Sequence, residues 1–153
     1  MQERVPALVF TVHGRLYGLL QDGGASLLPW LRRYDTPGPV PGVPSWTLGL
    51  LSVQGTVQAI ADLGAFLGHG TTIPAEDSRL VFVEAGDLRV GLLVDAVSGI
   101  RYFDSIEYAV FSEAEPYVAG HSAIHGQQIR ILDGVNLLQA MARALGSPLA
   151  GRA

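Results

Sequence analysis

An internal repeat constrains the fold of this chain more than any other feature of its sequence. Two apolar motifs occur twice in the same order: LVF at residues 8–10 and 80–82, and [YV]GLL at residues 17–20 and 90–93. The offset is 72 at the first motif (80 − 8) and 73 at the glycine of the second (91 − 18). Two copies are too few for a solenoid. The repeat therefore predicts two similar subdomains that share a core.

A second set of matching residues extends the repeat. Two glycines and an aspartate recur at a constant offset of 71, as Gly49, Gly55 and Asp62 in the first copy and Gly120, Gly126 and Asp133 in the second. We expect a single unit over residues 1–153, with the first copy at residues 7–67 and the second at residues 79–145.

Composition restricts the class of protein further. With 153 residues, 48% hydrophobic and 16% charged, the chain has the size and composition of one globular domain. A net charge of −4 argues against nucleic-acid binding, which requires a concentrated basic face. Cysteine is absent, and no apolar run is long enough to cross a membrane or to resemble a secretory signal. We expect a cytoplasmic protein without membrane insertion.

Short β-strands joined by glycine-containing turns dominate the expected secondary structure. Turns at His13-Gly14, Gln54-Gly55, Gly86-Asp87 and His125-Gly126 are typical of β-hairpins. The expected strands cover residues 7–13, 15–20, 48–53, 56–62, 80–85, 88–97, 121–125 and 127–132. Four hairpins of this kind favour small β-barrels, because closure of a barrel removes exposed strand edges. The fold class is therefore mostly β.

Few helices are expected. Residues 134–145 have apolar side chains at helical spacing, and residues 63–67 form at most two turns at the equivalent point of the first copy. Asp62 and Asp133 precede these segments, so each is expected to act as an N-cap. Residues 35–44 and 68–78 are predicted loops. Pro29 argues against one continuous helix over residues 23–34, whose structure the sequence leaves open.

The sequence offers no convincing reaction centre. His121 and His125 share one side of a predicted strand if its alternation holds, but no third ligand lies nearby for zinc. His13 and His125 are better explained as turn residues that tolerate a positive φ. No Gly-x-Ser-x-Gly motif, cysteine or phosphate-binding loop is present. We therefore expect no enzyme activity, no cofactor and no metal.

A β-rich scaffold without a reaction centre is typical of a protein–protein adaptor. Exposed aromatic residues would contribute to its binding surface, although any single aromatic residue is more often part of a core. The candidates are Trp30, Tyr34, Trp46, Tyr102 and Phe103.

Several motifs resemble the CheW family. These are VPGVP at residues 40–44, LGLLSVQG at 48–55 with the following Val57, Ile60 and Asp62-Leu63, VGLLVDAV at 90–97, and the segments 117–120 and 129–133. The resemblance covers residues 7–145. It implies two intertwined, five-stranded SH3-like β-barrels that exchange strands, followed by a C-terminal helix.

The same resemblance implies a partner-binding site. The family couples the cytoplasmic tips of chemoreceptors to the regulatory domain of the histidine kinase CheA. Carried over by position, the partner-binding residues are Gly49, Ser52, Gln54, Gly55 and Val57.

This chain departs from the family pattern at two positions of that site and at one position that follows it. Gln54 replaces the family's Arg, Ser52 its Asn, and Ala59 its Pro. The Glu that pairs with the Arg has no match, and Ser26 is the nearest position. Joint loss of both charges is self-consistent, because one buried charge left alone costs several kcal/mol.

The sequence thus predicts a non-catalytic adaptor in chemotaxis or a related surface-motility pathway. Two alternatives remain at this stage. One is a double β-barrel that binds a small ligand in a cleft between its subdomains, and the other is a diverged adaptor with a partner outside chemotaxis.

Overall fold

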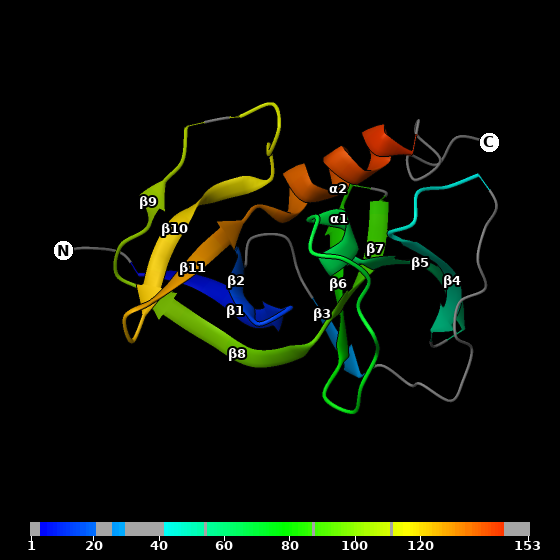
Figure 1. Ribbon diagram of the computed structural model, residues 1–153, viewed down its shortest axis with the longest axis horizontal. Helices are drawn as coiled ribbons and strands as arrows, with labels where there is room; N and C mark the ends of the chain where they lie inside the picture. Colours follow the sequence, from blue (N-terminus) through cyan, green and yellow to red (C-terminus); the bar gives the residue numbers. More distant parts are fainter. Residues whose placement is uncertain are drawn as a thin grey trace.

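The computed structural model describes residues 4–20, 26–29, 42–53, 55–86, 88–110 and 112–145, and most of them form β-strands (Figure 1). In chain order the elements are β1 (Val5–Val12), β2 (Arg15–Leu20), β3 (Ser26–Pro29), β4 (Thr47–Val53), β5 (Thr56–Asp62), α1 (Leu63–Phe66), β6 (Arg79–Ala85), β7 (Leu88–Val94), β8 (Ala96–Phe103), β9 (Glu107–Tyr108), β10 (Val118–Ile124), β11 (Gln127–Leu132) and α2 (Gly134–Ala144).

The strands form two sheets, and each sheet combines strands from both halves of the chain. The six-stranded sheet has the order β8-β1-β2-β11-β10-β9, and the five-stranded sheet has the order β3-β6-β7-β5-β4. Most neighbours are antiparallel, whereas β2 with β11 and β5 with β7 are parallel. The predicted mostly-β fold class is confirmed. The two-residue strand β9 adds a sixth strand to one sheet, where the sequence predicted five.

The register of the hairpins corrects one offset of the repeat. Val9 on β1 lies opposite Gly18 on β2, and Phe82 on β6 lies opposite Gly91 on β7. Val9 and Phe82 are therefore equivalent, with the same offset of 73 (82 − 9) as the two glycines. The offset of 72 from the matching LVF letters is wrong. It would exchange the two faces of the strand, because successive side chains point to opposite faces.

Three groups of buried apolar residues hold the sheets together. A central core lies between the sheets and includes Phe10, Leu19, Leu92, Leu132 and Leu138. A smaller core on the other face of the six-stranded sheet contains Ala7, Val9, Phe103, Ile129 and Ile131. Its counterpart on the five-stranded sheet contains Ile60, Leu80, Phe82 and Leu93. Each fully buried large side chain of this kind stabilises the fold by about 1.5–3 kcal/mol.

Both predicted helices are present, and their caps are confirmed. The Asp62 carboxylate accepts the backbone N–H of Ala65 at 3.2 Å, and the Asp133 carboxylate accepts that of Asn136 at 3.0 Å. The helix α2 packs on β6 and β7 and contributes Leu137, Leu138 and Met141 to the central core. In Figure 1 it is drawn in orange to red along the upper side of the molecule.

Two expected strands differ from the observed ones by three residues at one end, and the strands expected at residues 7–13, 48–53 and 80–85 differ by only one or two. The strand predicted at residues 88–97 is interrupted at Asp95: β7 ends at Val94, and β8 continues into the other sheet. At this point Asp95 donates its N–H to the Thr11 carbonyl at 2.9 Å, and its carboxylate accepts the His13 N–H at 2.6 Å. The strand β10 begins at Val118, three residues before the predicted start. In the segment left open by the sequence, residues 26–29 form β3.

Candidate partner-binding site

The β4–β5 hairpin carries all the partner-binding residues carried over from the family. Gly49 and Ser52 lie on β4, Gly55 lies in the turn, and Val57 lies on β5. Gln54 lies outside the described residues. Within the described part of the chain, β4 is an edge strand of its sheet and pairs only with β5. An edge strand leaves backbone donors and acceptors available to another chain.

Two glycines give this hairpin its backbone shape. Gly49 has a φ of 121° at a shift in the β4–β5 register, and Gly55 has a φ of 82° in the turn. Side-chain-bearing residues rarely adopt either conformation, so glycine is favoured at both positions. The register shift places Gly49 opposite Ile60, and the ladder then continues to Ser52 opposite Val57.

The hairpin has a core-facing side and a solvent-facing side. Leu48 and Leu51 pack against the small core that contains Ile60. Leu50 is 61% exposed and Val57 is 64% exposed, although both are apolar. The core-facing side chains fix the hairpin to the sheet, and the exposed ones form an apolar surface beside the free strand edge. Such a surface is a common feature of interaction sites.

Leu50 is the residue of this surface that the sequence analysis missed. The run Leu48-Gly49-Leu50-Leu51 has no clear alternation, because the register shift at Gly49 places an extra residue in the strand. Beyond the shift, alternation is regular, and Leu50 shares a face with the exposed Ser52. Counting every second residue backwards along the strand from the Gln54-Gly55 turn would have placed Leu50 on the same exposed face as Ser52.

Two of the aromatic candidates for the binding surface are part of the core. Trp46 is buried and meets Phe66 edge-on, with their ring centroids 5.0 Å apart, and Phe103 belongs to the core of the six-stranded sheet. As exposed binding residues these two are wrong. Tyr102 is 57% exposed, and the guanidinium of Arg4 lies 5.8 Å from the centroid of its ring. Trp30 and Tyr34 lie outside the described residues.

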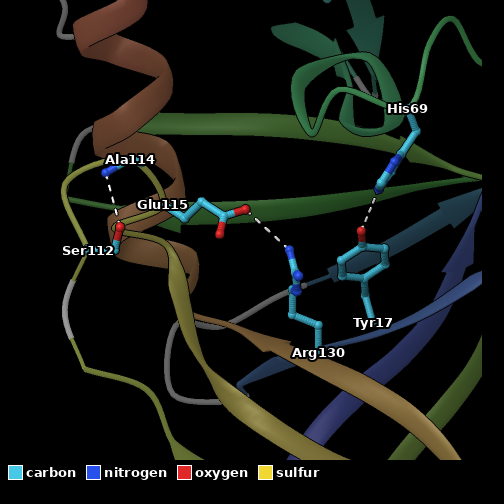
Figure 2. A network of polar contacts seen from close by, with 6 residues as sticks. All are labelled: Tyr17, His69, Ser112, Ala114, Glu115 and Arg130. Atoms are coloured by element: carbon cyan, nitrogen blue, oxygen red, sulfur yellow. Dashed lines mark hydrogen bonds and ion pairs between the residues drawn. The ribbon is translucent and has the colours of Figure 1, made fainter.

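A polar cluster joins the β1–β2 hairpin to the segment after α1. A hydrogen bond of 3.1 Å joins His13 Nε2 and Thr72 Oγ1. Figure 2 shows a second one, of 2.6 Å, between the Tyr17 hydroxyl and His69 Nε2. Burial raises the pKa of Tyr17 and lowers the pKa of His69, so the hydroxyl keeps its proton and the imidazole stays neutral. The hydroxyl therefore donates to the imidazole. These contacts join the six-stranded sheet to the segment between α1 and β6.

The histidines occupy turns and network positions in the structure. His13 and His125 have φ values of 51° and 48°, which confirms their predicted role in tight turns. Because β10 ends at Ile124, His125 does not continue the strand alternation from His121, and the prediction that the pair shares a strand face is wrong. In the described residues no group of three potential ligands among His, Cys, Asp and Glu could hold a metal ion.

Two sheets built from both halves of the chain present an apolar edge hairpin, and the two aspartates that recur in the repeat cap helices. None of the helices in the described segments is long and apolar enough to span a membrane. Residues 6–142 match the family model described as CheW-like domain. The chain belongs to the CheW-like domain family.

Named relatives and a solved structure agree with this assignment. The chain is 30% identical over 94 residues to Protein PilI of Pseudomonas aeruginosa, covering 58% of this chain and 52% of PilI. It is 34% identical over 70 residues to Chemotaxis protein CheW of Rhizobium meliloti, covering 46% and 45% of the two chains. The matches thus span about half the length of these relatives.

The fold resembles that of the scaffolding protein TtCheW from Thermoanaerobacter tengcongensis. The TM-score is 0.69 at 25% sequence identity, and the match covers 86% of this chain and 89% of the other. The architecture is accordingly the double SH3-like β-barrel.

Proposed function

We propose that the protein is a non-catalytic cytoplasmic adaptor that couples the cytoplasmic tip of a chemoreceptor to the regulatory domain of a CheA-type histidine kinase. The pathway is chemotaxis or a related surface-motility system. The printed names of the relatives support this proposal, since two similar proteins are chemotaxis proteins and the structural neighbour is a scaffolding protein.

The exposed apolar edge of the β4–β5 hairpin carries the proposal. We assign the partner-binding site to Gly49, Ser52, Gln54, Gly55 and Val57, and we add Leu50. Leu50 and Val57 would lose their solvent contact on binding, while the β4 edge would supply backbone hydrogen bonds to a partner strand. Gly49 and Gly55 would act indirectly, by allowing the backbone conformation that presents these side chains.

Binding of the cognate kinase's regulatory domain tests the proposal. Leu50→Ser and Val57→Ser should each weaken binding about tenfold, because an apolar contact of roughly this size contributes about 1.4 kcal/mol. Isothermal titration calorimetry measures the change. Val110→Ser is the matched control, since Val110 is 91% exposed but lies after β9, next to the other sheet.

Two outcomes would contradict the proposal. Wild-type protein that binds neither the kinase domain nor a receptor-tip fragment would exclude the adaptor function. Wild-type binding that both hairpin variants retain would exclude the hairpin as the site while leaving the function in place.

A further inference from the structure

A polar groove on the six-stranded sheet lies apart from the β4–β5 hairpin. It has a volume of about 310 Å³ and is lined by residues of β2, β10 and β11 and the adjoining turns. Its polar lining residues are Arg15, Tyr17, His121, Gln127, Gln128 and Arg130. No lining residue is acidic, although the chain as a whole carries a net charge of −4.

Strand register brings the polar groups of this groove to one face of the sheet. Arg130 lies beside Tyr17 across the parallel β11–β2 pair and opposite His121 across the antiparallel β11–β10 pair. Neighbouring residues in a ladder point to the same face. Arg15 precedes Tyr17 by two residues and Gln128 precedes Arg130 by two, so period two places them on that face as well.

The two arginines make the groove electrostatically positive. Their effect is visible at the groove's base, where burial raises the pKa of Tyr17 but Arg130 and Arg15 oppose the rise. At His69, the partner of Tyr17, burial lowers the pKa and the positive charges of Arg15 and Arg130 lower it further. Positive potential in a concave surface attracts anions.

One carboxylate of the chain already contacts the groove from outside. Glu115, in the segment between β9 and β10, pairs with Arg130 at 3.2 Å, and Figure 2 shows the two side chains reaching toward each other. Both remain partly exposed, at 48% and 40%. Glu115 lines a neighbouring cavity of about 170 Å³ that shares His121 and Arg130 with the groove. A ligand carboxylate or phosphate at Arg130 would therefore compete with Glu115.

We propose that this groove binds an anionic oxygen group, carried by a phosphate or a carboxylate ligand. The guanidinium of Arg130 supplies a planar pair of donors that suits either group, and Arg15 supplies a second positive charge. The amide of Gln128 and the ring of His121 supply further donors. Because the groove is open to solvent and Glu115 competes, we expect a Kd on the order of 1 mM.

Titration of the full chain with inorganic phosphate, and separately with succinate, tests the proposal. Two-dimensional NMR follows the ring of His121 and the backbone amides of Gln127 and Gln128 in a buffer free of both anions. A saturating shift with phosphate alone identifies a phosphate ligand, and one with succinate alone identifies a carboxylate ligand. Saturation by neither anion would overturn the proposal.

Three variants and a control make the test specific. Arg130→Gln and Arg15→Gln should each weaken binding about threefold to fivefold, the effect of losing one solvent-exposed ion pair. Glu115→Gln should strengthen binding by a similar factor, because it removes the competing carboxylate. Arg101→Gln is the control, since Arg101 lines a different groove of about 340 Å³ beside Asp104.

The variants also give results that would contradict the site. Equal weakening by Arg101→Gln would show general charge attraction, and unchanged affinity in Glu115→Gln would exclude competition at Arg130. Backbone spectra of each variant verify that it is folded. Neither the probes nor the variants involve the kinase or the β4–β5 hairpin, so this inference and the proposed adaptor function can fail separately.

Discussion

Ile60 on β5 lies in register with Gly91 on β7, and the two residues are packed so closely that a Cβ at position 91 would lie 2.9 Å from Ile60 Cδ1. The other sheet repeats this arrangement. Ile131 on β11 is in register with Gly18 on β2, and a Cβ there would lie 3.0 Å from Ile131 Cδ1. The glycines of the repeat therefore allow an isoleucine from a parallel strand to reach each barrel interior.

The first prediction concerns Gly91. Gly91→Ala should destabilise the protein by about 1–3 kcal/mol, because the new methyl group would also lie 2.7 Å from the rigid ring of Phe82. Urea unfolding measures the change. Ile60→Val, which removes the nearest aliphatic atom, should reduce the cost of Gly91→Ala in a double-mutant cycle. Strictly additive effects would show that the two residues do not share this contact.

The equivalent change in the other sheet should be milder. Gly18→Ala meets Ile131 Cδ1 at 3.0 Å and its next neighbours at 3.4 Å, so small side-chain shifts can accommodate the methyl group. We expect Gly18→Ala to lower the free energy of unfolding by less than Gly91→Ala does. The reverse order in parallel urea titrations would contradict this packing argument.

Gly55 should be sensitive to substitution for a conformational reason alone. Its φ is 82°, and a Cβ added there meets nothing within 4 Å. Gly55→Val should therefore cost about 1–3 kcal/mol through backbone strain and not through a clash. Gly55→Asn is the matched control, because Asn tolerates positive φ better, and thermal unfolding should place it between wild type and Gly55→Val.

The two N-cap aspartates should differ in their contributions. Asp133→Ala should cost about 1 kcal/mol, the usual effect of removing a cap. Asp62→Ala should cost more, because Asp62 is buried and its second carboxylate oxygen accepts the Thr72 N–H at 2.7 Å. Chemical denaturation of both variants checks the order. Equal losses would mean that the Asp62–Thr72 hydrogen bond contributes nothing to stability.

Stability should fall as the pH decreases because of His69. Its pKa in the folded protein is lowered from 6.5, chiefly by burial, so below that pH the unfolded chain binds a proton that the folded protein resists. The contribution of neutral His69 to the free energy of unfolding is complete above pH 6.5 and is lost as the pH falls through the lowered pKa. Urea midpoints measured across this range should fall less steeply for His69→Gln. An unchanged slope in that variant would assign the effect to other groups.

The sequence by itself determined the local features of the fold. The turns at His13-Gly14 and His125-Gly126 and the caps at Asp62 and Asp133 follow from neighbouring residues, since positive φ and unpaired helix N–H groups select particular residue types. The strands β5 and β11 were predicted with their observed bounds, because each follows a glycine turn and leads to an aspartate that caps a helix. The family motifs also identified the β4–β5 hairpin as a candidate site.

Only the tertiary structure decided how distant segments pair. The matching LVF motifs suggested a repeat offset of 72 residues. The pairing of Val9 with Gly18 and of Phe82 with Gly91 gives an offset of 73. The sheet change at Asp95 and the row formed by Tyr17, Arg130 and His121 likewise depend on partners far along the chain. Strands buried on both faces have little alternation to specify register, so packing of complete side chains selects it.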